Sequence, residues 1–574
     1  MVLFHGYFDN CTAVAAELQA NAADHAHLYG LAVERWGDEA DTRIIGEYCA
    51  VIADPDQHHL RLSRSPLRAP PLCYFHDERL AAAASVPRAL FAVGVDQKLS
   101  DRRIGDTALV NFTDREDSWF EGIRRVPTGA IVELQRGRER TLRTYYDLFA
   151  LPDVRMGSDA EYLARAGELL DEGVRACLAG FKRPGTTLSA GLDTPQVAAR
   201  TLAALPEDQR LPSFTFHPED GYDGREEPLT LGNERPFVER FAAMHPRLEP
   251  HFTANEGYGH DHRWNDFFHL MSGAPTGLSN MYVFHGIFAE AVKAGCDVLL
   301  LAEWGNYTFS DKGDWGYVEY FLKGNFRQWW RAISSLSRDD RSLPAHIAAR
   351  TLSALLPRSL WKLGKRLYRR GGQSLLDLMQ PLSPQFRESS GADSRLKASG
   401  WEIERYQPWN RRHAQRLLFQ MDDAEAAEIY QAFEQMYGVA QRDPMAYRPF
   451  VEFCFGLPVK MFMRDGIVRW MAKEMAKGIM PEEQRANAAN GRWDADWHLR
   501  IGRQRQAYLA ELDRLEADER IGPMLDIPRL RANLVDWPDQ TEVDPQQVYG
   551  REFAVPRALL IARFVRYIEG RNDG

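Results

Sequence analysis

Short segments in which apolar and polar residues alternate fill the first 150 residues. Residues 46–54, 60–64, 72–75 and 129–134 have the composition and length of β-strands, and turn residues separate them. This pattern predicts a first region made mainly of short strands that lie beside one another.

After residue 150 the pattern changes to an alternation of helices and buried strands. Residues 160–179 carry apolar side chains at helical spacing, and 211–217 and 297–302 are apolar runs typical of parallel strands. Residues of about 318–440 predict a helical insert, and the chain from Ala507 onward predicts structural helices. We therefore expect an α/β fold in the second region.

The stretch Thr186–Arg200, TTLSAGLDTPQVAAR, predicts a strand, a turn of small residues and a helix. Pro195 suits the first turn of a helix, and the helix start directs unpaired N–H groups at the preceding turn. Phosphate is the natural occupant of such a turn, and Asp193 is suited to hold a metal ion beside it. A plain strand-to-helix connection also uses Gly and Asp, so local chemistry alone leaves both interpretations open.

This stretch resembles the SGGLDSS pyrophosphate loop of the asparagine synthetase-like ATP pyrophosphatases, which adenylate a carboxylate and transfer the acyl group to an amine. Ala190 stands where the family has Gly, and Thr194 and Pro195 replace two serines. Ala fits only if its position does not require a positive φ, and the replacements leave fewer hydrogen-bond donors. The resemblance implies that ATP and its pyrophosphate are bound by Ser189, Ala190, Gly191, Leu192, Asp193 and Thr194.

A second turn, Ala302–Asn306, follows the buried strand in DVLLLAEWGNYTFS. Ligands of open α/β sheets collect at the carboxyl ends of the strands. Asparagine synthetases have a G-E-G-x-D-E pattern here, whose Asp binds magnesium, whereas this chain keeps Glu303 but has Asn306. The resemblance implies a magnesium ion held by Asp193 and Asn306, with Glu303 handling the amine proton. The form of this turn is more similar to that of the lasso-peptide cyclases.

Further candidate residues lie in separate segments of the second region. Glu234 stands where the family has an acidic residue near ATP, but a Glu favoured by the helix dipole is an equal alternative. Arg448, Arg469 and Arg485 lie in segments that resemble the C-terminal motifs of the family, and guanidinium groups suit phosphate and carboxylate. An isolated Arg is more often structural. The resemblance implies ATP contacts for Glu234, Arg448 and Arg485, and catalytic roles for Glu303, Arg469 and Asp443.

The segment 485–497 separates the subfamilies. Asparagine synthetases and β-lactam synthetases have a Lys before the Gly, whereas lasso-peptide cyclases usually have an R-G-x-Q-x-x-D-W type of segment. Gly491, Asp496 and Trp497 fit the second pattern, but Asn490 supplies no charge. A neighbouring arginine has to compensate in the predicted mechanism.

Residues 1–150 resemble the glutaminase-like domain of the asparagine synthetases, an αββα domain of the N-terminal-nucleophile type, in LRLSRSPLRAPPLCYF and FEGIRRVPTGAIVEL. That domain uses an exposed N-terminal Cys as its nucleophile. Position 2 is Val2, and no processing that would expose Cys11 is visible. We expect a degenerate domain over 1–150 that has lost glutamine hydrolysis, followed by a doubly wound asparagine synthetase-like domain over 151–574.

The composition, 44% hydrophobic and 26% charged, is typical of a soluble globular protein. The net charge of −10 argues against general nucleic-acid binding. The six cysteines form no CxxC motif, which favours reduced thiols. Since no signal peptide and no apolar run of roughly 20 residues are present, we expect a cytoplasmic protein without a transmembrane segment.

Together these resemblances imply a lasso-peptide cyclase that uses ATP and Mg²⁺. Such an enzyme adenylates an Asp or Glu side chain of a precursor peptide, and the N-terminal amine of the peptide then closes a macrolactam. The implied partners are the precursor peptide, a leader-binding protein and a leader peptidase. The alternatives are an asparagine synthetase-like or β-lactam synthetase-like ligase for small substrates, and a catalytically inactive member of the family.

Overall fold

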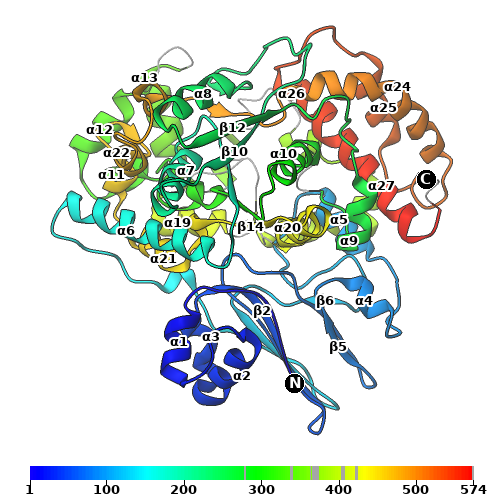
Figure 1. Ribbon diagram of the computed structural model, residues 1–574. Coiled ribbons are helices and arrows are strands. Elements are labelled where there is room, and N and C mark those ends of the chain that lie inside the picture. Colours follow the sequence, from blue (N-terminus) through cyan, green and yellow to red (C-terminus); the bar gives the residue numbers. More distant parts are fainter. Residues whose placement is uncertain are drawn as a thin grey trace.

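The computed structural model describes residues 1–276, 280–336, 341–357, 359–361, 363–364, 374–401, 408–419 and 424–571. The N-terminal part forms antiparallel sheets at one end of the molecule, and the remaining chain builds a larger α/β body above it (Figure 1). No helix in the described part of the chain combines the length and apolar character that a membrane crossing needs.

The N-terminal part contains two antiparallel sheets. The first has the order β1-β2-β3-β7-β8 and the second the order β5-β4-β6. Their strands are β1 (Val2–Phe8), β2 (Gly46–Asp54), β3 (His59–Arg64), β4 (Cys73–His76), β5 (Ala81–Ala84), β6 (Arg124–Arg125), β7 (Ala130–Gln135) and β8 (Thr141–Thr144). The strands predicted at 46–54, 60–64, 72–75 and 129–134 are thus confirmed, with small shifts at their ends.

Helices cover the outer faces of these sheets. The helices are α1 (Cys11–Leu18), α2 (His25–Trp36), α3 (Ala40–Arg43), α4 (Pro87–Phe91) and α5 (Asp101–Ala108). Leu28 and Tyr29 of α2 pack with Phe8 and Tyr48 of the first sheet, and a separate core that includes Leu62 lies between the two sheets. This order of layers is the predicted αββα arrangement.

The central sheet of the second region is parallel and has the order β12-β10-β9-β13-β14. The strands are β9 (Pro184–Thr187), β10 (Leu211–Phe216), β12 (Leu248–Thr253), β13 (Val298–Leu300) and β14 (Ala440–Arg442). Thr186 of β9 pairs with Ser213 on one side and Leu300 on the other. The strand order reverses at β9, and in doubly wound sheets the ligand site lies at such a reversal.

Helices pack on both faces of this sheet. They include α6 (Asp159–Leu178), α7 (Asp193–Ala204), α8 (Arg235–Met244), α9 (Trp264–Met271), α10 (Met281–Lys293), α20 (Ala424–Tyr437) and α21 (Arg448–Gly456). The core around α6, α7 and α21 lies on one face, and the core around α10 and α20 lies on the other. The predicted doubly wound α/β class is therefore confirmed, and α6 matches the helix predicted at 160–179.

The predicted insert at about 318–440 is mainly helical where the structure describes it. It contains α11 (Gly316–Leu322), α12 (Phe326–Ser334), α13 (Leu343–Ile347), α14 (Ser353–Leu355), α16 (Leu375–Met379), α17 (Pro384–Ser389), α18 (Ala392–Ser399) and α19 (Arg411–Leu418). The C-terminal part contains α22 (Trp470–Met475), α23 (Glu482–Ala486), α24 (Trp497–Glu516), α25 (Ile527–Val535), α26 (Pro545–Tyr549) and α27 (Val555–Ile568). Two short strand pairings connect parts of these segments: β11 (Thr230–Leu231) pairs with β17 (Asn490–Gly491), and β15 (Met463–Arg464) pairs with β16 (Ile467–Val468).

Candidate active site

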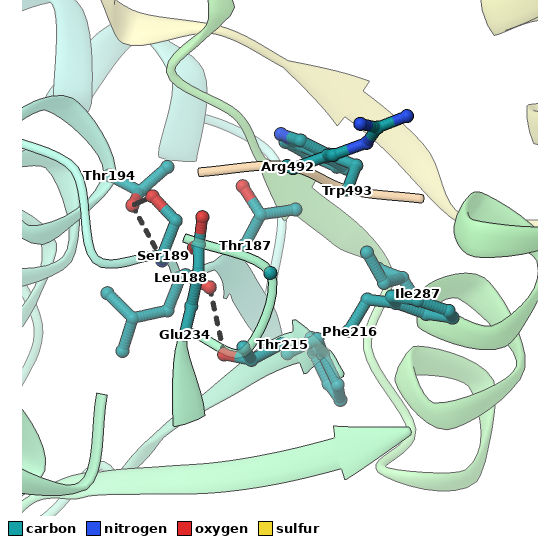
Figure 2. A pocket seen from close by; sticks show the side chains of 12 residues that line it. Thr187, Leu188, Ser189, Thr194, Thr215, Phe216, Glu234, Ile287, Arg492 and Trp493 are labelled. Carbon is teal, nitrogen blue, oxygen red and sulfur yellow. Dashed lines mark hydrogen bonds between the residues drawn. The ribbon is translucent and has the colours of Figure 1, made fainter. Parts of the chain in front are cut away.

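The loop between β9 and α7 is closed by hydrogen bonds of its own. The Thr194 hydroxyl accepts a hydrogen bond of 2.9 Å from the Ser189 N–H, and the two hydroxyl oxygens are also 2.9 Å apart (Figure 2). Ala190 does not have a positive φ, so the condition for replacing the family's Gly is met. The loop therefore keeps the shape of an anion-binding turn at the start of α7.

Glu234, which directly precedes α8, fixes the same loop from the other side. Its carboxylate accepts a hydrogen bond of 2.9 Å from the Ala190 N–H. A Cβ at Gly491 would lie only 1.5 Å from Glu234 Oε1, so only glycine fits there. Burial raises the pKa of Glu234 to about 7, because the charged form loses its hydration.

Asp193, at the start of α7, is 8% exposed. Burial raises the pKa of Asp193 to about 6, although the nearby Ser310 hydroxyl and the positive charge of Arg469 partly offset the shift. Its Oδ1 is buried and accepts no hydrogen bond, and a Cβ at Gly305 would lie 2.5 Å from its Cγ. A buried carboxylate oxygen without a partner fits a hard cation that also contacts phosphate.

Asn306, the second predicted metal ligand, already has a hydrogen-bond partner. Asn306 Oδ1 accepts a hydrogen bond of 3.2 Å from Arg469 Nη2. Arg469 has a φ of 56°, in the left-handed region, a conformation that costs of order 1 kcal/mol and is concentrated at functional sites. No group of three or more His, Cys, Asp or Glu residues in the described ranges is arranged to hold a metal ion. The residues present thus fit a magnesium ion held mainly by Asp193 and phosphate oxygens.

Glu303, in the turn after β13, contacts two groups from distant parts of the chain. Its Oε2 accepts a hydrogen bond from the Tyr430 hydroxyl on α20, and it lies 3.9 Å from Nη1 of Arg68, in the loop between β3 and β4 of the N-terminal part. The Glu303 side chain remains 32% exposed. A partly exposed carboxylate with fixed partners is suited to accept a proton.

Asp443 follows β14 and is completely buried. Its Oδ2 accepts a hydrogen bond of 3.0 Å from the Trp304 N–H, and its Oδ1 accepts one of 2.8 Å from the Met445 N–H. Burial raises the pKa of Asp443 to about 6. Since Asp443 does not line the cavity described below, this geometry supports the turn that carries Glu303.

These groups enclose a cavity of about 590 Å³, here named the loop cavity. A smaller pocket that shares Ser189, Thr194 and Glu234 with it extends toward Arg492 and Trp493 (Figure 2). Among the residues that line the loop cavity are Thr187, Ser189, Gly191, Asp193, Thr194, Glu234, Glu303, Trp304, Asn306, Tyr307, Tyr430, Arg469, Asn490, Gly491 and Trp493. The carboxyl ends of β9 and β13 therefore meet at one site, as their order in the sheet requires.

A second cavity of about 640 Å³ lies at the seam between the N-terminal sheets and the α/β body, and it is here named the seam cavity. Its walls are mainly aromatic and aliphatic, and Trp304 and Tyr307 line both cavities. The seam cavity is lined by Pro66, Leu67, Arg115, Thr128, Thr144, Tyr146, Asp147, Leu148, Phe149, Trp304, Tyr307, Leu418 and Phe419. Its volume and composition are typical of small-molecule and peptide sites.

Comparison with protein families gives this site its context. Residues 165–554 match the model of the asparagine synthase family, and residues 15–146 match that of a glutamine amidotransferase domain. The chain belongs to the asparagine synthase family. The members of this family are ATP-dependent, AMP-forming amide ligases. Apart from Phe112, the residues that line the loop cavity lie in the part of the chain that carries the family match.

Individual relatives add little to the family assignment. No curated protein matches the chain. One similar solved structure is the glutamine phosphoribosylpyrophosphate amidotransferase from B. subtilis, complexed with ADP and GMP, at 12% identity and a TM-score of 0.19. The match covers 35% of this chain and 43% of that chain, and so slight a similarity supports no statement about activity.

Besides Ala190 and Asp443, three further residues predicted from the asparagine synthase motifs do not line the loop cavity. Arg448 donates to the carbonyl oxygens of Thr42 at 2.8 Å and Ile44 at 3.0 Å, across the seam. Arg485 pairs with Glu482 and donates to the Lys473 carbonyl. Leu192 is 4% exposed and packs in the core around α7. Guanidinium groups bind backbone carbonyls and carboxylates as well as phosphate, so sequence alone does not separate these uses.

Three residues at or beside the site were not predicted as site residues, although Arg68 and Trp493 lie in segments that resemble the family. Tyr430 is one aromatic residue among several on the amphipathic helix α20, and Arg68 belongs to the other domain. Trp493 is 39% exposed and stacks on Phe284, with ring centroids 5.1 Å apart. For Trp493, the signal that the sequence offers is its position two residues after Gly491 in the segment 485–497.

Proposed function

We propose that the protein is a lasso-peptide cyclase: it adenylates an Asp or Glu side chain of a precursor peptide and joins it to the N-terminal amine of the same peptide. ATP is converted to AMP and pyrophosphate, and the product is a macrolactam. This reaction is one form of ATP-dependent amide formation, which is the general activity of the asparagine synthase family.

The seam cavity is the observation that carries this proposal. ATP fills most of a cavity the size of the loop cavity, and aspartate with ammonia needs little further space. A peptide needs a second, larger space beside the reacting atoms. The seam cavity adjoins the loop cavity through Trp304 and Tyr307, and its aromatic and aliphatic walls suit apolar peptide side chains.

The residues of the loop cavity fit the first step of this reaction. The backbone N–H groups at the start of α7 bind the phosphates of ATP, and Asp193 with the amide oxygen of Asn306 would hold magnesium. When bound, magnesium neutralises phosphate charge and orients the phosphates for attack. Arg469, hydrogen-bonded to Asn306 and lining the same cavity, adds a positive charge where pyrophosphate departs.

The second step requires a base and a dry cavity. A free peptide amine is partly protonated at neutral pH, so a proton has to leave its nitrogen as the amide bond forms. Glu303, oriented by the Tyr430 hydroxyl, is suited to accept this proton. The N-terminal domain contributes Phe112 to the wall of the loop cavity, and exclusion of water there would protect an acyl-adenylate.

The proposed partners follow from the proposed substrate. A precursor peptide requires removal of its leader before its core has a free N-terminal amine, so we propose a leader peptidase and a leader-binding protein as partners. The N-terminal domain then needs no glutamine hydrolysis, because the amine comes from the peptide.

The test is pyrophosphate release in the presence of ATP and magnesium. A linear peptide with a free N-terminus and an internal Asp or Glu is compared with aspartate plus ammonia. Release with the peptide, together with loss of one water from its mass, is the expected result. Release with aspartate alone would return the protein to the small-substrate ligases, and absence of ATP binding would favour an inactive member of the family.

A further inference from the structure

Arg68 extends from the N-terminal domain into the synthetase domain. It lies in the loop between β3 and β4 and is 6% exposed. Its Nε pairs with Glu47 at 3.2 Å, and its Nη2 donates to the Gln441 carbonyl at 3.5 Å, at the edge of the parallel sheet. The side chain is thus anchored in both domains.

The remaining nitrogen of Arg68 faces the active site. Nη1 is buried, makes no hydrogen bond and lies 3.9 Å from Oε2 of Glu303. The guanidinium carbon lies 4.0 Å from the ring centroid of Tyr430, whose hydroxyl donates to the same Oε2. Two side chains from separate segments, Arg68 and Tyr430, therefore meet at one carboxylate oxygen of Glu303.

This geometry limits what Arg68 can do. It does not line the loop cavity, so it does not contact substrate there. A planar guanidinium held by an ion pair, a carbonyl and an aromatic ring has little freedom to move. Its positive charge therefore attracts the Glu303 carboxylate in a fixed direction and holds Tyr430 beside it.

We propose that Arg68 is a positioning residue for Glu303, so that the amidotransferase-like domain completes the active site of the synthetase domain. This inference rests on the proposed function. In the step that it supports, the amine nitrogen bonds to the acyl carbon, and the bond from this carbon to the AMP oxygen breaks. AMP leaves with the electron pair, and a proton passes from the nitrogen to Glu303.

A double-mutant cycle on the enzyme tests this role. Arg68→Ala should lower kcat for amide formation roughly tenfold to a hundredfold, because a base held in the wrong position accepts the proton less efficiently. The KM for ATP should change little. Arg68→Lys should recover part of the loss. In a Glu303→Gln background, Arg68→Ala should cause no further loss, because Arg68 acts through Glu303. Independent, multiplying losses would overturn the proposal.

Arg442 provides a matched control at the same seam. It pairs with the same Glu47, at 3.2 Å, and with Asp9, at 2.7 Å, but no contact joins it to Glu303 or Tyr430 in the described structure. Arg442→Lys and Arg68→Lys both keep the charge and disturb the seam. If the two variants lower kcat equally, the loss comes from the disturbed contact between the domains and not from Glu303. The positioning role of Arg68 is then wrong.

A second arm needs no substrate. The thermal midpoints of the wild type, Arg68→Ala, Glu303→Gln and the double variant are compared without nucleotide. Arg68→Ala should lower the midpoint by about 1–2 °C more in the wild type than in the Glu303→Gln background. If the shifts in thermal midpoint of the two single variants simply add in the double variant, Arg68 and Glu303 do not interact and the proposal is wrong. If no substrate releases pyrophosphate from the wild type, the proposed function fails, while this arm still decides on Arg68.

Discussion

Two buried aspartates, one in each domain, have opposite surroundings. Asp41 in the N-terminal domain accepts hydrogen bonds from Tyr48 at 2.9 Å and Ser63 at 2.5 Å, and its other oxygen pairs with Arg61 at 2.6 Å. Asp193 in the synthetase domain has a buried oxygen without any hydrogen bond, and its pKa is raised to about 6. Both side chains are removed from water, but only Asp41 has partners for both of its carboxylate oxygens.

The comparison separates structural polar groups from functional ones. A buried network in which every member has its partners stabilises one arrangement of the chain. A buried carboxylate left without a partner costs free energy, and such costs are concentrated where a ligand supplies the missing interaction. The buried network around Asp41 is therefore structural, whereas Asp193 marks the ligand site.

The largest expected effect concerns Asp193. Asp193→Asn should lower pyrophosphate release by roughly 10³-fold, because the carboxylate that would hold magnesium is lost. The thermal midpoint should not fall, since the neutral amide avoids the cost of a buried charge. Pyrophosphate release and a thermal melt of the same preparation measure both effects.

Nucleotide affinity with and without magnesium supplies the control for this variant. The loss of affinity should be confined to the condition with magnesium. Equal losses in both conditions would mean that Asp193 shapes the loop rather than binding a cation, and the contrast with Asp41 would then disappear.

Asp41→Asn should have the opposite profile. Arg61, whose side chain is 7% exposed, would be left as a buried charge without its partner, which costs about 3–5 kcal/mol in the free energy of unfolding. Denaturant unfolding of the isolated variant measures this loss. Nucleotide affinity at low temperature, where the variant is folded, should stay within about twofold of the wild type. A large loss of affinity without a loss of stability would contradict the assignment of Asp41 as structural.

The candidate site could be predicted from the sequence where it depends on strand ends. The loop that ends in Asp193 follows a short predicted strand and Glu303 follows a buried apolar run, and parallel strands bring their carboxyl ends together. Arg448 shows the limit of this reasoning. Its guanidinium suits phosphate, but the chain folds it against the carbonyl oxygens of the N-terminal domain.

The contacts across the seam could not be predicted. Arg68 and Tyr430 lie 362 positions apart, and their meeting depends on how the two domains pack, which no local periodicity encodes. The fold class depends on patterns within each domain and was accessible for that reason. Residues that complete a site from another domain become visible only in three dimensions.

The pH dependence of stability that Glu234 causes tests the same comparison between the two domains. Its pKa is raised from 4.5 to about 7 in the folded state, so the folded protein retains a proton that the unfolded chain has lost. Stability should therefore fall as pH rises from about 4.5 to 7 and stay constant above it. Glu234→Gln removes this dependence and should be more stable than the wild type at pH 8 by about 3 kcal/mol.

Denaturant unfolding of both proteins between pH 5 and 8 measures the difference. Glu239→Gln, on the exposed side of the same helix with a side chain 50% exposed, controls for the loss of one negative charge. If the stability difference between wild type and Glu234→Gln is the same at every pH, the carboxyl of Glu234 is not held in its neutral form. Glu234 then gives no further support to the contrast between structural and functional buried carboxyl groups.

The smallest expected effect concerns the seam cavity. Thr144 ends β8 at the wall of this cavity, so Thr144→Trp fills space there without entering the core. The KM for a peptide substrate should rise about tenfold, equivalent to about 1.4 kcal/mol, while the KM for ATP stays unchanged. Thr141→Trp, at the other end of the same exposed strand, is the matched control and should leave both values unchanged. Equal KM values for the peptide in all three proteins would remove the seam cavity from the substrate path and favour the ligases of small substrates.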